Sequence, residues 1–241
     1  MRKYCTIQHP KHGKVKFDLY PFQEKCLTDF KDNRYNIILK ARQLGISTLS
    51  AGYSLWLMLF HNDKNVLVIA TGKDTAKNLV TKVRVMYEGL PQWLKTGTEE
   101  INKLSIRFTN GSQIKAIASN ESAGRSEALS LLKLDEAAFI DKVDTIWTAA
   151  QQTLATGGDC IVLSTPNGVG NWFHQQWVGA EDGTNQFNTI RLHWTDHPDR
   201  NQSWRDDQDK ILGPSKASQE CDTDFLTSGQ SVVDPKILSW H

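Results

Sequence analysis

Four short apolar runs, rich in valine, isoleucine and leucine, restrict the fold of this sequence more than any other feature. They are NIILKA (36–41), NVLVIAT (65–71), LSLLKLDE (129–136) and CIVLSTP (160–166). None alternates between apolar and polar residues, and such runs are typical of strands buried on both faces of a parallel sheet. Helix-like stretches, with apolar residues three and four apart, lie between them at 47–60, 73–87 and 143–154. This alternation predicts an α/β fold with a central, mainly parallel sheet flanked by helices.

One segment departs from the alternation. KLSIRFTNGSQIKAIAS (103–119) has apolar residues at every second position on both sides of Asn110-Gly111, the usual sequence of a two-residue type I′ turn. We therefore predict a β-hairpin there.

Beyond about residue 180 the sequence becomes polar and rich in turn residues, as in GAEDGTN and DHPDRNQ. This change predicts a core over 1–180, which includes the N-terminal segment, and a small subdomain over 181–241.

Composition limits the class of protein without naming its function. Hydrophobic residues make up 39% of the 241 residues and charged residues 23%, which indicates an ordinary globular protein. The longest apolar run, 55–60, is too short to span a bilayer, so we expect no membrane partner. The net charge of +1 gives no overall signature of nucleic-acid binding. A local basic patch or a ring of subunits can still supply positive potential.

The segment KARQLGIST (40–48) follows one predicted strand and begins a predicted helix. It lies in the frame of the phosphate-binding loop G-x-x-x-x-G-K-[ST], but Lys40 stands in place of the first glycine and Ile46 in place of the lysine. The free N–H groups at a helix N-terminus suit phosphate. Gly45 would let the backbone approach it, and Ser47 would direct a hydroxyl at a phosphate-bound Mg²⁺. The alternative is an ordinary strand-turn-helix joint, which Ile46 favours.

Two further predicted strands end in polar residues. LLKLDEAAF places Asp135 and Glu136 together at a strand's end, where one carboxylate could bind Mg²⁺ through water and the other polarise an attacking water. CIVLSTPNG ends in a polar tip, residues 164–168, which could hydrogen-bond a γ-phosphate or its water. The alternatives are a solvated strand end and an ordinary turn, because Pro-Asn-Gly is turn sequence in its own right.

These three motifs, in this order, resemble the ATPase domain of the large terminase subunit of tailed bacteriophages, the motor that pumps DNA into capsids. ARQLGIST is similar to the family's phosphate-binding loop, LLKLDEAAFI to its Walker B segment and LSTPNG to its coupling motif. YPFQ (20–23) resembles its adenine-reading Q motif, and SNESAGRSEA lies where the family carries a catalytic arginine. The similarity runs from about residue 20 to 168 and continues through FLTSGQSVVDP.

The resemblance implies a RecA-like P-loop ATPase that uses ATP and Mg²⁺. Its catalytic residues would be Glu136 as the base, Arg125 as a finger inserted into the neighbouring subunit, and Arg42. Ser47 and Asp135 would hold the metal. Ser164, Thr165 and Asn167 would sense the γ-phosphate and couple its loss to the subdomain. The residues expected to bind ATP are Gln23, Lys40, Arg42, Gln43, Leu44, Gly45, Ile46, Ser47 and Thr48.

The cation for the phosphates is the main departure from the family pattern. Some family members carry a displaced lysine at the start of the loop, which would match Lys40. A long side chain from that position can fold inward to the β and γ oxygens. Arg42, whose planar fork also suits phosphate, is the competing candidate. A solvated or salt-bridged Lys40 and an ordinary surface Arg125 are the structural alternatives.

The resemblance also implies partners and a location. They are double-stranded DNA, a portal protein, a small terminase subunit and further copies of the chain, as a ring on the capsid, with a monomer in isolation left open. The location would be the cytoplasm of the infected bacterial host, with transient docking at the procapsid portal. Full large terminases continue into a nuclease domain, whereas this sequence stops at VDPKILSWH, so we predict no nuclease activity.

Two rival interpretations remain open. A superfamily-2 helicase-like ATPase has a Q motif, a phosphate loop and an Asp-Glu pair in the same order, but it closes ATP between two RecA-like domains, and this sequence holds one motif set. A non-enzymatic regulatory module would bind ATP only to hold a shape, and Glu136 argues against it.

Overall fold

A computed structural model describes residues 3–119 and 128–226 of the chain. These residues form two compact units. The first unit contains residues 3–34, 45–119, 128–135 and 140–161, and the second contains residues 35–44, 136–139 and 162–226. The subdomain boundary expected near residue 180 stays a prediction.

The first unit is built on six strands in the order β9-β8-β4-β7-β6-β5. Their bounds are β9 Asp159–Ser164, of which the first three residues belong here, β8 Leu131–Asp135, β4 Asn65–Ala70, β7 Gln113–Ala118, β6 Ser105–Phe108 and β5 Thr98–Ile101. β4 runs parallel to both β7 and β8, whereas β6 is antiparallel to its neighbours. β8 is buried along its whole length and β4 along all but its first residue, as is typical of largely apolar strands inside a parallel sheet.

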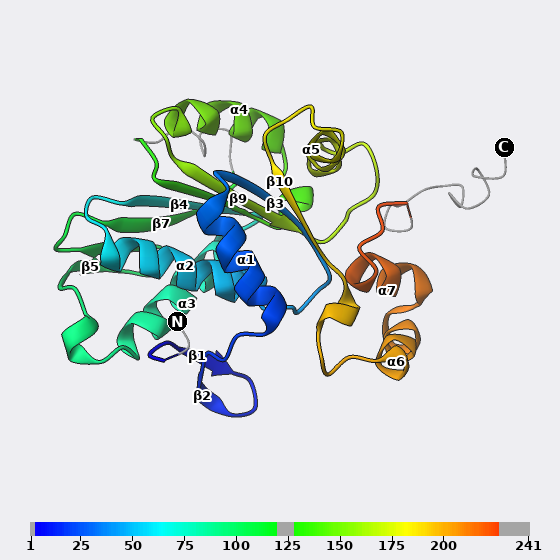
Figure 1. The fold of residues 1–241 in the computed structure, drawn as a ribbon, viewed down its shortest axis with the longest axis horizontal. Coiled ribbons are helices and arrows are strands. Elements are labelled where there is room, and N and C mark those ends of the chain that lie inside the picture. The colour runs from blue at the N-terminus through cyan, green and yellow to red at the C-terminus, as the bar shows by residue number, and fades with distance from the viewer. Residues whose placement is uncertain (1–2, 120–127, 227–241) are drawn as a thin grey trace. The chain divides into compact units, whose positions relative to one another are not determined.

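Helices cover both faces of these strands. α4 (Val143–Leu154) packs on β8, and α3 (Lys73–Glu88) packs on β4 and β7. α2 (Ile46–Phe60) packs between α3 and α1 (Pro21–Asp32), and Figure 1 shows it on the face opposite to α4. The hairpin of β1 (Thr6–His9) and β2 (Gly13–Lys16) packs on α3, and a short 3₁₀ turn, η1, spans Gln92–Leu94.

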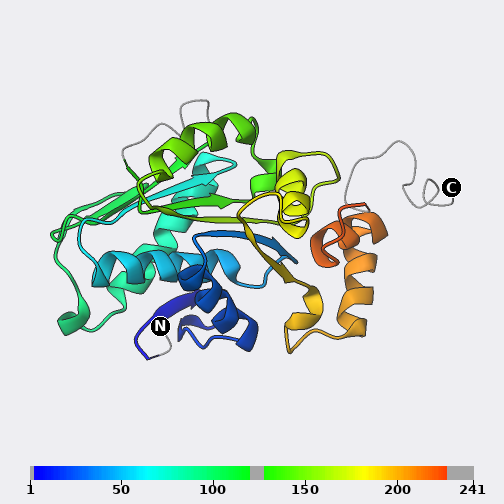
Figure 2. The same ribbon diagram turned by 45° about the horizontal axis from the view of Figure 1, so that its top comes forward.

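The second unit has the strand order β10-β3-β9, with β10 (Asn188–Leu192) parallel to β3 (Tyr35–Lys40). α5 (Trp172–Glu181) packs on β3 and β10. α6 (Gln202–Leu212) and α7 (Pro214–Cys221) pack against each other, as Figure 2 shows in orange. Two 3₁₀ turns, η2 (Ala137–Phe139) and η3 (Trp194–Asp196), complete the unit.

The predicted α/β fold with a mainly parallel sheet is confirmed. Each of the four apolar runs contains a strand, β3, β4, β8 or β9, and the three helix-like stretches are α2, α3 and α4. In the part of the chain that the structure describes, no helix is both long and apolar enough to cross a membrane.

The hairpin at 103–119 is confirmed as β6 and β7, but the predicted two-residue type I′ turn is wrong. Only Gly111 of the two expected turn residues has a positive φ, 80°, whereas type I′ needs it at both. The loop spans residues 109–112 instead. Asn110 is held there by tertiary contacts, because its side chain donates to the Met58 carbonyl at 2.8 Å and its own carbonyl accepts from the Asp63 N–H at 3.1 Å.

Arg205 joins α6 to the end of α7. Its guanidinium donates to both carboxylate oxygens of Asp222 at 2.7 Å and pairs with Asp209 on the next turn of α6. The Arg205 side chain is only 10% exposed. A bidentate pair of this kind fixes geometry as well as charge.

Replacing Arg205 with alanine should therefore destabilise the second unit. We expect a loss of about 2 kcal/mol in the free energy of unfolding, between the ~1 kcal/mol of an exposed pair and the ~3–5 kcal/mol of a buried one, because Asp222 is partly solvated. Urea unfolding of the variant and the wild type measures this loss in the free energy of unfolding. The control is Lys210→Ala, which breaks the pair of an exposed lysine with Asp207. Equal shifts in both variants would contradict a structural role for Arg205.

Candidate functional site

The loop between β3 and α2 requires a glycine at its end. Gly45 has φ 74°, in the left-handed region, and a Cβ atom built on it would lie 2.8 Å from the Gln23 Nε2 atom. Both facts exclude a larger residue without rearrangement. Gln43, two residues earlier, also has a left-handed φ of 58°. α2 begins directly after Gly45, with the free N–H groups of its first turn unpaired by the helix.

Gln23 lies beside Gly45 in the first unit. It is 3% exposed, and its Oε1 atom accepts a hydrogen bond from the Tyr20 N–H at 3.1 Å, which closes a capping box at the start of α1. The YPFQ segment therefore gives α1 both its proline start and its cap. The adenine-reading role of Gln23 stays a prediction.

Lys40, the last residue of β3, forms an ion pair in the second unit. Its Nζ atom lies 2.8 Å from the Glu136 Oε1 atom, and the two side chains are 6% and 32% exposed. The Glu136 Oε2 atom accepts from the Thr165 N–H at 3.3 Å. Glu136 has φ 55°, a conformation that costs a non-glycine residue on the order of 1 kcal/mol or more. Lys40 and Thr165, two predicted site residues, thus meet at the carboxylate of a third, Glu136, whose backbone is strained.

The remaining residues of the LSTPNG tip hold the turn that follows Glu136. The Ser164 hydroxyl accepts from the Ala138 N–H at 3.1 Å, and the Asn167 amide donates to the Ala138 carbonyl at 3.0 Å. From α7, Gln219 donates to the Pro166 carbonyl at 3.2 Å. The tip is therefore linked to η2 on one side and to α7 on the other.

Arg42 is also held by α7. Its guanidinium donates to the Glu220 carboxylate at 2.9 Å, and its backbone N–H donates to the Glu220 carbonyl at 2.7 Å. The guanidinium of Arg200 donates to the carbonyls of Arg42 and Gln43, at 3.1 Å each. The Arg42 side chain is 66% exposed, unlike that of Lys40. Sequence reasoning missed Glu220 and Arg200, which carry no motif.

A second group of polar side chains lies in the first unit. The Ser47 hydroxyl donates to the Asp135 Oδ1 atom at 3.2 Å, which brings together the two residues predicted to hold a metal. Lys133, two residues before Asp135 on β8, donates from Nζ to the Ser47 carbonyl at 3.3 Å. Sequence reasoning missed Lys133, although a lysine flanked by leucines inside a predicted buried strand was a usable signal.

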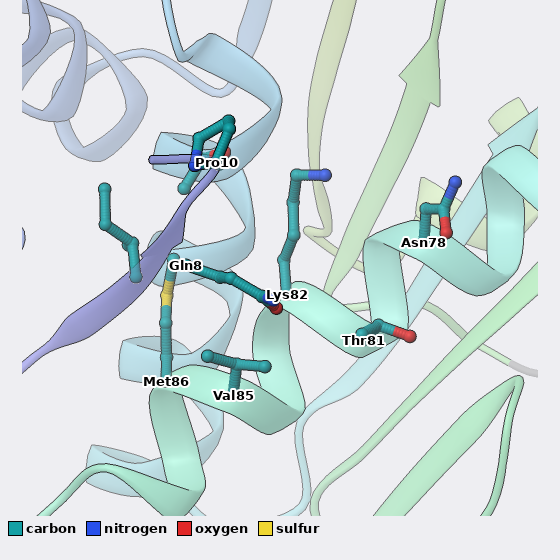
Figure 3. A pocket seen from close by; sticks show the side chains of 9 residues that line it. Gln8, Pro10, Asn78, Thr81, Lys82, Val85 and Met86 are labelled. Carbon is teal, nitrogen blue, oxygen red and sulfur yellow. The ribbon is translucent and has the colours of Figure 1, made fainter. Parts of the chain in front are cut away.

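The other predicted residues divide by burial. Leu44 and Ile46 have buried side chains, so only their backbone groups could face a ligand. Thr48 lines a cavity of about 350 Å³ between β1 and one face of α3, and Figure 3 shows Lys82, Asn78 and Met86 entering it from α3. A cavity of about 310 Å³ in the second unit contains none of the predicted residues. Arg125 lies outside the described residues.

A strand, a glycine-ended loop and a helix, with acidic residues ending a further buried strand, are the parts of a P-loop NTPase fold. Residues 37–227 match the family described as "Terminase large subunit, T4likevirus-type, N-terminal". The chain belongs to this family.

Other proteins that this chain resembles are also described as large terminase subunits or their ATPase domains. The probable terminase large subunit gp28 of Escherichia phage Mu is 25% identical over an alignment of 186 residues that covers 71% of this chain and 33% of the relative, so the chain spans about a third of that protein. Among solved structures, the large terminase ATPase domain of Thermus phage P74-26 aligns with a TM-score of 0.71 at 20% identity, over 87% of this chain and 94% of that one. The large terminase of a second, thermophilic bacteriophage has been solved in complex with ADP. It aligns with a TM-score of 0.66 at 14% identity, over 85% of this chain and 52% of that one.

Proposed function

We propose that this chain is the ATP-hydrolysing part of a phage DNA-packaging motor. Membership of the terminase family supports this proposal, and so does the ADP complex of the similar large terminase from a thermophilic bacteriophage. The observation that carries it is the Lys40–Glu136–Thr165 group, because it holds a carboxylate between a buried lysine and a backbone N–H, on a residue whose backbone conformation is strained, and such strain clusters at active sites.

Lys40 and Arg42 are the proposed partners of the phosphates. Lys40 supplies a charge at the start of the loop that Ile46 cannot supply, and it would exchange Glu136 for phosphate oxygens. Arg42 would have to leave Glu220 to do the same. We favour Lys40 because it is the more buried of the two, and water screens its charge less.

Ser47 and Asp135 fit a magnesium ion. Mg²⁺ prefers hard oxygen ligands and takes one or two from a protein that also binds phosphates. A hydroxyl and a carboxylate within hydrogen-bonding distance of each other offer such a pair. When bound, Mg²⁺ would neutralise charge on the phosphates.

Glu136 is the proposed general base. Its carboxylate would take the proton from a water molecule as the water oxygen bonds to the γ-phosphorus. The bond from that phosphorus to the bridging oxygen breaks, and ADP leaves with the electron pair. Thr165 orients the same carboxylate through its N–H group.

The polar tip and α7 are the proposed route of coupling. Ser164 and Asn167 fix the turn after Glu136, and Gln219 links the tip to α7. A change at Glu136 when the γ-phosphate is lost could therefore move α7. Gln23 is proposed to read adenine and Arg125 to act on a neighbouring subunit, both from the family motifs.

The partners proposed are double-stranded DNA, a portal protein, a small terminase subunit and further copies of this chain in a ring. The proposed setting is the host cytoplasm.

The predicted lack of nuclease activity is tested by incubating the protein with plasmid DNA and Mg²⁺ or Mn²⁺. Cleavage of the plasmid would contradict the prediction.

The test of function is phosphate release from ATP, at protein concentrations that allow self-association. We expect release that needs Mg²⁺, stops with EDTA and rises with double-stranded DNA, because a packaging motor grips a duplex. A helicase-like ATPase would instead separate the strands of a tailed duplex. ATP binding without phosphate release under every condition would favour the regulatory module and contradict the proposal.

A further inference from the structure

Lys133 is the most buried charged side chain in residues 3–119 and 128–226. It lies in the middle of β8 and is 1% exposed. Burying an ammonium group costs several kcal/mol unless nearby groups compensate it, and leucine occupies the neighbouring positions 132 and 134. A lysine is therefore a poor choice for filling this position in the core.

The contacts of Lys133 lead to the two residues proposed to hold the metal. Its Nζ atom donates to the Ser47 carbonyl at 3.3 Å and lies 3.9 Å from the Asp135 Oδ2 atom. The other oxygen of Asp135, Oδ1, accepts from the Ser47 hydroxyl at 3.2 Å. Each of the three residues therefore interacts with the other two.

The secondary structure makes this arrangement possible. Residues two apart in a strand point to the same face of the sheet, so Lys133 and Asp135 share the face that α2 covers. Ser47 is in the first turn of α2, and its carbonyl also accepts from the Ser50 hydroxyl at 3.1 Å. Lys133 thus joins the carboxyl-terminal half of β8 to the start of α2.

We propose that Lys133 is a positioning residue that sets the spacing and orientation of Ser47 and Asp135 for a divalent cation. The inference rests on the proposed function. The ammonium attracts Oδ2 of Asp135 and leaves Oδ1 directed at the Ser47 hydroxyl, while its hydrogen bond fixes the turn that carries Ser47. In this proposal Lys133 acts through Ser47 and Asp135, so its loss should weaken metal binding and leave the phosphate contacts of the loop in place.

Metal binding to the 241-residue protein tests this inference, with Mn²⁺ as a spectroscopic substitute for Mg²⁺. Free Mn²⁺ is measured by electron paramagnetic resonance in the presence of saturating ADP, and ADP affinity is measured by calorimetry in EDTA. In Lys133→Met we expect the half-saturating Mn²⁺ concentration to rise at least tenfold and the metal-free ADP affinity to change less than threefold. The control, Lys115→Met, removes an exposed lysine from β7 and should change neither.

Two further variants make the outcomes distinct. Asp135→Asn should weaken Mn²⁺ binding, and adding Lys133→Met to it should change the affinity less than twofold, because Lys133 acts through Asp135. Lys133→Gln keeps a donor for the Ser47 carbonyl without the charge and should fall between wild type and Lys133→Met. Lys133→Gln also tests the inference if the methionine variant does not fold.

Normal Mn²⁺ binding by Lys133→Met, with weakened binding by Asp135→Asn, would overturn the inference and leave the proposed function standing. Unchanged binding by Asp135→Asn, or a wild type that does not bind Mn²⁺ with ADP, would contradict the proposed function itself. If neither Lys133 variant folds, Lys133 is a requirement of the fold, and the inference is also overturned.

Discussion

Glu136→Gln is expected to lower the rate of ATP hydrolysis by roughly 10²- to 10⁴-fold, the usual contribution of a general base, while ATP still binds. Glutamine has nearly the shape of glutamate but cannot accept the proton of the attacking water. Its amide oxygen can still accept from the Thr165 N–H, so the strained turn at Glu136 should keep its conformation.

Single-turnover phosphate release and ATP binding by calorimetry would separate the two effects. The matched control is Glu181→Gln, which changes a half-exposed glutamate on α5 of the same unit and should leave the rate unchanged. Retained turnover by Glu136→Gln would remove Glu136 from the mechanism. Loss of ATP binding as well would show that the variant had disturbed Lys40 or the loop.

Lys40→Ala is expected to weaken binding of an ATP analogue with Mg²⁺ at least tenfold, or roughly 1.5–3 kcal/mol, on the scale of hydrogen bonds to charged groups. The mostly buried ammonium of Lys40 is screened little by water, so its contact with phosphate should be worth more than a surface contact. The same substitution also removes the partner of Glu136, so hydrolysis should fall further than binding.

Calorimetry on three variants distinguishes the candidate cations. Arg42→Ala tests the competing residue, and Lys210→Ala removes an exposed lysine of α6 as a control for lost charge. Tenfold weaker binding in Arg42→Ala, with normal binding in Lys40→Ala, would transfer the role to Arg42. Normal binding in both variants would mean that the loop is not a phosphate site.

The sequence alone determined four strands, three helices, the β6–β7 hairpin and the candidate residues at the strand ends, whereas β1, β2, β5, β10, α1 and α5–α7 were not predicted. Largely apolar runs that do not alternate with polar residues are typical of strands buried on both faces, so β3, β4, β8 and β9 followed from local sequence. Asp135 and Glu136 at the end of a buried strand indicated a metal-binding or catalytic site, because the geometry of a strand does not itself require two acidic residues there. Gly45 was chosen from the loop pattern, and it has a left-handed φ of 74° in the structure, while its phosphate-binding role stays a prediction.

Only the tertiary structure decided which of these residues meet. Lys40 lies 2.8 Å from Glu136, although the two are far apart in sequence, and Arg42 is bound by Glu220 of α7. The turn at Asn110 takes a form set by contacts with Met58 and Asp63 instead of its own preference. The role of Lys133 follows only from the packing of α2, which places the Ser47 carbonyl beside it. Pairings of this kind depend on packing between distant segments, whereas burial periodicity and turn chemistry depend on neighbours in the chain.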